Sequence, residues 1–104
     1  MQDSVVTIRL MDVVSGTATG EDGTTLFFLL DKSVSSNQKI RLSLASATPF
    51  STSFLNTSFG DLSDKYGLET IRTLIMFTDI TPSQLKKLRS YFEQLGTLVW
   101  SNPD

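Results

Sequence analysis

Alternation of apolar and polar residues marks the extended segments of this chain. Val5–Leu10 and Lys39–Ser43 alternate cleanly, which predicts a strand in each. Met11–Val14 either continues the first strand or pairs back on it as a second short strand. Glu69–Phe77 is expected to be a central strand, because its last residues are apolar on both sides of the pleat. A final short strand is expected at Thr97–Trp100.

The segment between the first strand and Lys39–Ser43 is expected to contain a loop and a helix. The loop is predicted at Ser15–Gly23, which carries three of the six glycines. Thr24–Ser35 contains the run LFFLL, which fits a buried strand or a buried helix equally. Leucines recur there at helical spacing before a polar tail, so the helix is favoured and the strand stays as the alternative.

The stretch Thr48–Gly67, with the sequence TPFSTSFLNTSFGDLSDKYG, organises the chain. Pro49 closes the extended segment before it, because the residue preceding a proline avoids helical geometry. Three hydroxyls then offer N-caps for a helix: Ser51, Thr52 and Ser53. The predicted helix buries one stripe of side chains: Leu55, Phe59, Leu62 and Tyr66. Gly67 falls where the residue after a helix commonly has a positive φ.

The last helix has the clearest predicted start. Thr81 is its N-cap, Pro82 occupies the first helical position, and Gln84 completes a capping box. Gly96 is expected to end the helix. Its predicted buried stripe comprises Leu85, Leu88, Phe92 and Leu95.

This order of strands and helices predicts an α/β fold. We expect a single-domain sandwich over residues 1–104, with a loose tail at about 101–104. Its sheet is expected to be four- or five-stranded, mixed and mainly parallel, and to carry about three helices. Lys39–Leu44 and Glu69–Phe77 are expected side by side in its middle. Partners of such sheets meet the carboxyl ends of the strands, so the turn at Phe50–Ser53 is the expected functional edge.

Charge and composition argue against several classes of function. Nine Lys and Arg against eleven Asp and Glu give a net charge of −2, so nucleic-acid binding through phosphate contacts is not expected. The chain has no histidine and no cysteine, which removes the commonest general base, the commonest metal ligand and thiolate chemistry. No apolar run is long enough for a membrane span. We therefore expect a cytoplasmic protein without catalytic activity, cofactor or membrane partner.

Two short motifs within Lys39–Phe92 have a known counterpart. A strand leads into the pair Ser53-Phe54 at a helix start, and the motif FGDL follows at Phe59–Leu62. A second strand, a loop and a further helix come next. This arrangement resembles the STAS-like domain family, which is related to sulphate-transporter and anti-sigma-factor-antagonist domains. The resemblance implies the α/β fold already expected from the pattern.

The resemblance also implies a regulatory signalling domain that docks a histidine-kinase-type ATPase. In the related domains such a partner phosphorylates a Ser or Thr at the start of this helix, and the matching candidate phosphoacceptor is Thr52, with Ser53 one residue on. The partner-binding candidates on this surface are Ser51, Thr52, Ser53, Phe54 and Asn56. Helix capping is the more common role of such hydroxyls, and core packing is the favoured role of Phe54.

Other functions stay open. A small phage or mobile-element protein that binds and inhibits a host protein would share these features, and so would a phosphate-binding module that uses the helix N-terminus. Asp61 and Asp64 share a helix face and could hold Mg²⁺, although a solvated acidic face is the favoured interpretation. The protein partner is expected to bind either a monomer or a homodimer of this chain.

Overall fold

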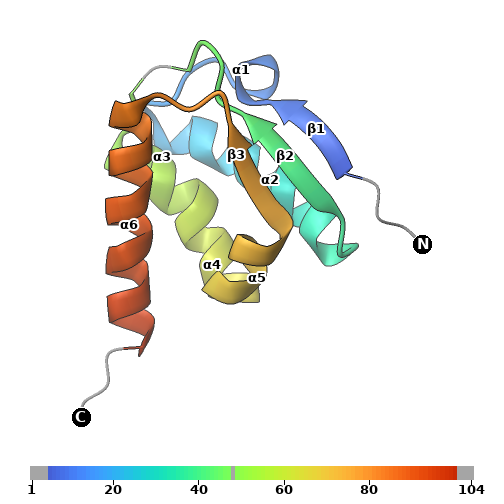
Figure 1. Cartoon of the computed structure of the whole chain (residues 1–104), viewed down its shortest axis with the longest axis vertical. Coiled ribbons are helices and arrows are strands. Elements are labelled where there is room, and N and C mark those ends of the chain that lie inside the picture. The colour runs from blue at the N-terminus through green and yellow to red at the C-terminus, as the bar shows by residue number, and fades with distance from the viewer. Residues whose placement is uncertain (1–4, 48, 101–104) are drawn as a thin grey trace.

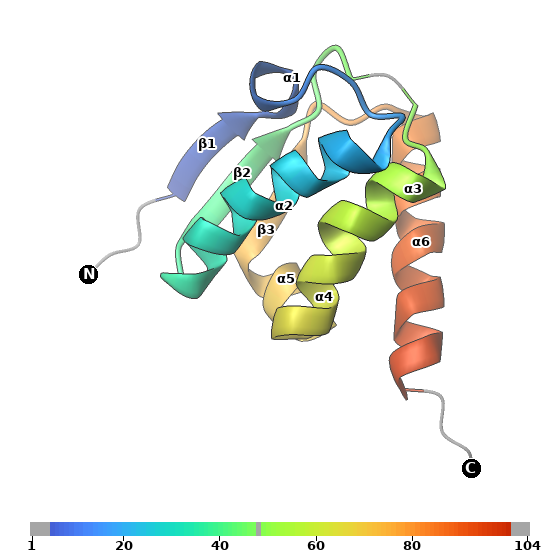
Figure 2. The ribbon, with the colours of Figure 1, turned by 180° about the vertical axis from the view of Figure 1, so that it is seen from behind.

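Three parallel strands form the sheet at the centre of the fold. The computed structural model describes residues 5–47 and 49–100, and the side chains of these up to residue 95, so the expected tail at 101–104 lies outside the described residues. The strands lie in the order β1 (Val5–Arg9), β2 (Lys39–Ser43) and β3 (Ile75–Thr78). Figures 1 and 2 show that the helices gather on one face of the sheet and leave the other face uncovered.

Helices connect the strands, and one follows the last strand. The helix after β2 is continuous and is divided into α3, the π-helical turn η1, and α4. In chain order, the helices are α1 (Leu10–Val13), α2 (Gly20–Ser35), α3 (Thr52–Leu55), η1 (Asn56–Gly60), α4 (Asp61–Tyr66), α5 (Leu68–Leu74) and α6 (Pro82–Trp100).

The core lies between the covered face of the sheet and the helices packed on it. Ile40 and Leu42 of the central strand β2 are fully buried there, whereas Lys39 and Arg41 alternate with them and are exposed. The helices contribute a matching set of buried apolar side chains: Leu26, Leu30, Phe54, Leu55, Phe59 and Leu62. Burial of this set is the main favourable term in folding, since each large apolar side chain contributes about 1.5–3 kcal/mol.

The predicted α/β class is confirmed, but the predicted numbers of strands and helices are wrong. The described residues form three parallel strands rather than four or five in a mixed sheet, and more helices than the three expected. Met11–Val14 is not a strand, because Leu10–Val13 makes a helical turn that buries Leu10. β2 and β3 are adjacent as expected, yet only β2 is central, since β3 lies at the edge of the sheet.

Most of Glu69–Phe77 is helix rather than strand. α5 occupies its first part, and β3 begins only at Ile75. The buried side chains of α5 recur at every third residue: Leu68, Ile71 and Leu74. This is a helical period, and the apolar run at the end of the segment concealed it.

The helix favoured for Thr24–Ser35 is confirmed, but it begins earlier than predicted. α2 starts at Gly20, inside the predicted loop Ser15–Gly23. Its N-cap is Thr19, whose hydroxyl oxygen accepts a hydrogen bond from the Asp22 amide at 3.1 Å. This cap satisfies one of the free N–H groups of the first turn, which explains why glycines there do not prevent the helix.

The predicted start of α6 is confirmed. Its predicted end at Gly96 and the predicted burial of Leu85 are wrong. Thr81 N–H donates to Gln84 Oε1 at 3.0 Å, and Gln84 N–H donates to Thr81 Oγ1 at 3.1 Å, which is a capping box. The helix continues past Gly96 through the predicted strand Thr97–Trp100, since one glycine costs a helix only about 1 kcal/mol. Leu85 of the predicted buried stripe is 41% exposed.

α2 and the helix after β2 lie side by side (Figure 2), and Gly23 of α2 packs closely against the other helix. A Cβ at this position would overlap with Thr57 Oγ1 and with the carbonyl oxygen of Phe54. The Thr57 hydroxyl also donates to the carbonyl of Gly20 at 2.7 Å. The contact therefore joins the first turn of α2 to the neighbouring helix and leaves no space for a side chain at Gly23.

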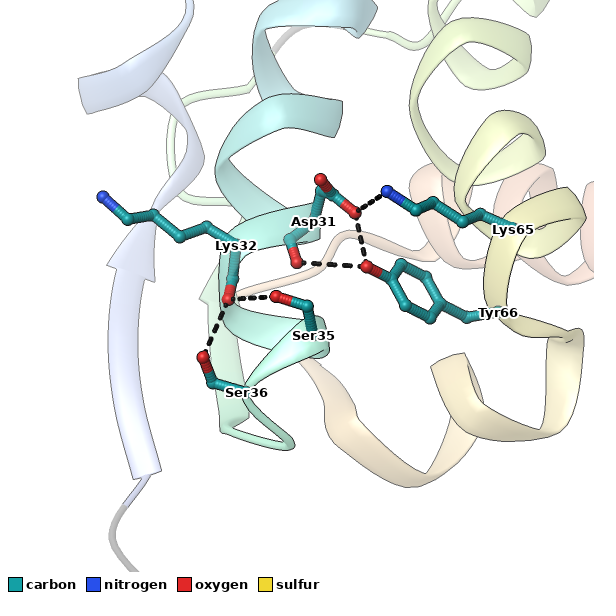
Figure 3. A network of polar contacts seen from close by, with 6 residues as sticks. All are labelled: Asp31, Lys32, Ser35, Ser36, Lys65 and Tyr66. Carbon is teal, nitrogen blue, oxygen red and sulfur yellow. Dashed lines mark hydrogen bonds and ion pairs between the residues drawn. The ribbon is translucent and has the colours of Figure 1, made fainter.

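A hydrogen-bonded group fastens α2 to α4 further along the same pair of helices (Figure 3). Tyr66 donates its hydroxyl hydrogen to the Asp31 carboxylate at 2.5 Å, and the Lys65 ammonium lies 2.9 Å from the same oxygen. The hydrogen bond from Tyr66, followed by the contact with Lys65, lowers the pKa of Asp31 below its ordinary value of 3.8. The same carboxylate raises the pKa of Tyr66.

We expect Gly23→Ala to destabilise the fold by about 1–3 kcal/mol, the usual range for overpacking. Helix propensity favours alanine over glycine, so a loss of stability has to come from the overlap with the neighbouring helix. Gly20→Ala is the matched control, because its Cβ would meet no atom closer than 3.6 Å. Urea unfolding measures the stability of the two variants. Equal free energies of unfolding would contradict the close contact at Gly23.

Tyr66→Phe is expected to lower the free energy of unfolding near neutral pH, and the loss should vanish in acid. The folded-state pKa of Asp31 is lowered, so its contribution is present above the unfolded-state pKa of about 4 and is lost as the pH falls through the folded-state value. Urea unfolding at a series of acidic pH values measures this. The control is Tyr91→Phe, whose hydroxyl donates to the amide oxygen of Asn56 and not to a carboxylate. A Tyr66→Phe loss that does not depend on acid pH would exclude the Asp31 contact.

Candidate functional site

The carboxyl ends of the three parallel strands lie at one edge of the sheet (Figure 1). Side chains at the ends of two strands form hydrogen bonds with residues of the neighbouring loops. Arg9 at the end of β1 donates to the Ser46 hydroxyl at 3.2 Å, and Ser43 at the end of β2 donates to the Asp79 carboxylate at 2.5 Å. Ser46 and Asp79 both adopt positive φ angles, of 66° and 55°. This edge is the place where partners of α/β sheets are expected to bind.

Two chain segments cross at this edge and bring two helix starts together. The Ser51 amide donates to the carbonyl of Thr17 at 3.0 Å, and the Thr17 hydroxyl donates to the carbonyl of Pro49 at 3.0 Å. Thr17 is fully buried in the crossing. The loop before α2 and the loop before α3 are therefore fixed to each other, and both helices begin from the same surface.

Ser51 is the N-cap of α3. Its hydroxyl oxygen accepts from the Phe54 amide at 3.0 Å, and the hydroxyl hydrogen is donated to the carbonyl of Ala18 at 2.9 Å. The capping role considered for the three hydroxyls thus belongs to Ser51. This hydroxyl links the crossing described above to the first turn of the helix.

Thr52 and Ser53 follow the cap and are both exposed. Neither hydroxyl makes a hydrogen bond to another residue in the described part of the chain. They occupy the first turn of a continuous helix that runs from Thr52 to Tyr66. The free N–H groups and the dipole of that turn favour negative charge, so this is a surface on which a phosphate would be tolerated.

The side chains of the remaining two partner-binding candidates make contacts within the fold. Phe54 has no exposed area and stacks on Phe50 with ring centroids 5.8 Å apart, so its ring belongs to the core and not to a docking surface. Asn56 is exposed, but its amide oxygen accepts from the Tyr91 hydroxyl at 2.8 Å. Burial, and then the carboxylates of Asp61 and Asp64, raise the pKa of Tyr91 to about 12, which keeps this hydroxyl protonated. Asn56 therefore connects the helix to α6.

Three residues shape the edge through contacts with distant parts of the chain. Thr17 closes the crossing, Thr57 spans the two helix starts, and Gln84 Nε2 donates to the carbonyl of Ala47 at 3.0 Å, which ties α6 to the loop after β2. Each of these contacts joins residues more than thirty positions apart. Of the three, only Gln84 was singled out from the sequence, as part of a capping box.

A hollow of about 350 Å³ lies beside the helix start. Pro49 and Phe50, just before the cap, form one side of it, and Gln84 and Lys87 of α6 form another. Its lining is mostly apolar, with the Lys87 ammonium as the only charged group among the lining residues described. A mostly apolar hollow with one basic lining residue therefore lies next to the residues that precede α3.

The described residues contain no group of three or more His, Cys, Asp or Glu that could hold a metal ion. Asp61 and Asp64, the pair considered for Mg²⁺, both lie on an exposed helix face. Within the same part of the chain, no helix has the length and apolar character needed to cross a membrane.

A parallel sheet with its helices on one face, and a hydroxyl-rich helix start after the central strand, define a small α/β domain of the STAS-like type. The family described as a STAS-like domain of unknown function (DUF4325) matches residues 22–85, and the chain belongs to this family. The matched region runs from the first turn of α2 into α6, so it contains most of the carboxyl edge. No curated protein and no solved structure shows significant similarity to the chain.

Ser51→Ala is expected to lower the stability by about 1 kcal/mol, because it removes the N-cap of the helix. Thr52→Ala and Ser53→Ala should each change the stability by less than about 0.5 kcal/mol, since both residues are exposed and their hydroxyls form no hydrogen bond with a described residue. Chemical denaturation of the three variants measures the free energy of unfolding of each and so compares three neighbouring hydroxyls. If Thr52→Ala lowered the free energy of unfolding as much as Ser51→Ala does, the assignment of Ser51 as the N-cap would be contradicted.

Proposed function

We propose that this chain is a non-enzymatic regulatory domain that docks a protein partner over the start of the Thr52–Tyr66 helix. The partner is a histidine-kinase-type ATPase, and Thr52 is the residue that it phosphorylates. Ser53 is the second acceptor on the same turn. The family membership supports a regulatory domain, and the choice of surface and residue is our own inference.

One observation carries the proposal. Ser51 supplies the cap, so the exposed hydroxyl of Thr52 next to it takes no part in holding the fold. A residue with this position can be modified without loss of structure. A phosphate attached to it meets the free N–H groups of the first helical turn.

The proposed modification is a phosphoryl transfer from ATP bound to the partner. The Thr52 hydroxyl oxygen forms a bond to the γ-phosphorus as the bond between that phosphorus and the β,γ-bridging oxygen breaks, and ADP leaves. The hydroxyl proton passes to a carboxylate base that the partner supplies. The chain itself supplies only the phosphoryl acceptor, the exposed Thr52 hydroxyl.

The charge of the added phosphate determines whether phosphorylation strengthens or weakens binding of the partner. The phosphate adds nearly two negative charges at neutral pH. The neighbouring first turn of α2 already carries Glu21 and Asp22, and the whole chain has a net charge of −2. A partner that presents an acidic or apolar surface to the helix start would be released by phosphorylation.

Thr52→Glu, which mimics the phosphate in part, should weaken binding of the partner by at least about tenfold and leave the stability within about 1 kcal/mol. Thr52→Ala should bind the partner as the parent chain does but should not accept phosphate. The partner is first identified by capture on the immobilised parent chain and mass spectrometry. Its affinity for each purified variant is then measured by calorimetry, and phosphate transfer by intact mass.

Thr73→Glu is the matched control, because Thr73 is an exposed threonine of α5 at the opposite end of the sheet. It introduces the same charge and should leave the affinity unchanged. Equal binding of the parent and Thr52→Glu would overturn the proposal. That outcome, with no phosphate transfer, would instead fit the alternative of a small phage or mobile-element protein that inhibits a host protein.

A further inference from the structure

β3 has one edge, on the side away from β2, with which no strand in the described part of the chain pairs. It is the outermost strand of the sheet, and its Thr78 carbonyl accepts from the Leu44 amide, so the backbone of Thr78 faces β2. Successive residues of a strand direct their backbone groups to opposite sides, so the N–H and C=O of Phe77 face outward. An outward pair of this kind is the template to which another extended chain can add.

An apolar groove lies along this edge, between β3 and α6. It has a volume of about 390 Å³ and is lined by five apolar side chains: Phe77, Ile80, Leu85, Leu88 and Phe92. The rings of Phe77 and Phe92 both contact Phe59 of the core, at centroid distances of 5.4 and 5.8 Å. The floor of the groove is therefore fixed by the core and needs no rearrangement to receive a ligand.

The groove explains why Leu85 departs from the predicted buried stripe of α6. Leu85 is 41% exposed, although Leu88, one turn further along the helix, is buried. Its side chain lines the groove, so the apolar stripe of α6 continues beyond the part that packs on the rest of the fold. A partner in the groove would cover the remainder of this stripe.

The charges around the groove are mainly positive. Arg72 of α5 and Arg89 of α6 line it, with Glu93 as the single acidic lining residue. Arg89 makes no ion pair within the described residues. Arg72 has one weak partner, Glu69, at 4.0 Å, and both side chains of that pair are more than half exposed. Both guanidinium groups are therefore available to carboxylates of a partner.

We propose that an extended segment of a partner protein, with alternating apolar and acidic residues, binds along β3 in this groove. Its backbone pairs with the outward N–H and C=O of Phe77. Alternate side chains enter the apolar groove, and the acidic residues meet Arg72 and Arg89. This mode of binding is strand addition to a sheet edge, in which backbone bonds supply affinity and alternate side chains supply specificity.

A second copy of the chain fits the groove less well than such a segment. Two copies paired along β3 would bring the same two arginines and the same short strand to each other, so the positive charges would repel. The groove is also separate from the helix start, because it lies on the β3–α6 side and shares no lining residue with the Thr52 surface. The test of Thr52 and the test of the groove are therefore independent.

The test uses two capped synthetic peptides: one alternates valine with glutamate, and its counterpart alternates valine with lysine. Amide NMR of the whole chain during titration should show shifts in β3, Ile80 and Leu85 with the glutamate peptide and little change with the lysine peptide. N-methylation of the central valines and glutamates together should abolish the shifts, since it removes the backbone donors on both sides of the added strand, whichever direction that strand runs. Shifts that survive N-methylation, equal shifts with both peptides, or no shifts would each overturn the proposal.

Arg89→Glu should weaken binding of the glutamate peptide by about fivefold or more, as expected for loss and reversal of one exposed charge contact. Lys32→Glu is the matched control, because it makes the same charge reversal on an exposed position of α2, away from the groove. Equal weakening by both variants would contradict a specific site. Self-association in sedimentation experiments, with concentration-dependent shifts at Phe77 and Leu85, would assign the groove to a second copy and would also overturn the proposal.

Discussion

The arrangement of the molecule depends on the close contact between the first turn of α2 and the helix that follows β2. Gly23 allows the two backbones to approach, and Thr57 joins them by donating to the carbonyl of Gly20. At the other end of the same pair of helices, Tyr66 and Lys65 hold Asp31. The two helices consequently behave as one layer, which covers a single face of the sheet.

This contact also determines the surface at the carboxyl edge. With the two helices fixed, the loops that precede them cross, and Ser51 bonds both to the backbone of the other loop and to its own helix. Because Ser51 satisfies the structural requirement alone, Thr52 and Ser53 need not take part in the fold. An exposed hydroxyl beside a structural one is the feature from which the proposed regulation follows.

The parts of the fold that could be predicted from the sequence are those with local causes. The alternation in β2, the stripe of the Thr52–Tyr66 helix and the capping box of Thr81 and Gln84 each depend on residues close together in the chain. The family resemblance, based on the same region, is confirmed by the match over residues 22–85. For the candidate site, the sequence indicated the helix start at Ser51–Ser53 but could not assign the cap among three adjacent hydroxyls.

The wrong predictions concern features that depend on distant contacts or on competing periods. Glu69–Leu74 carries a helical period that ends in an apolar run, and only the buried positions of α5 distinguish it from a strand. The exposure of Leu85 depends on where α6 lies relative to the sheet edge. The pairing of Tyr91 with Asn56 spans thirty-five positions, and no local pattern indicates it.

The most direct test of the central claim is mass spectrometry of the protein isolated from its native cells, with fragmentation of the peptide that contains residues 51–53. The account predicts a fraction of molecules with a single phosphate on Thr52, or on Ser53 as the second acceptor, and an unmodified Ser51. Phosphate on Ser51, whose hydroxyl is engaged on both sides, would contradict the account, and so would the absence of phosphate under every growth condition in which the partner is present.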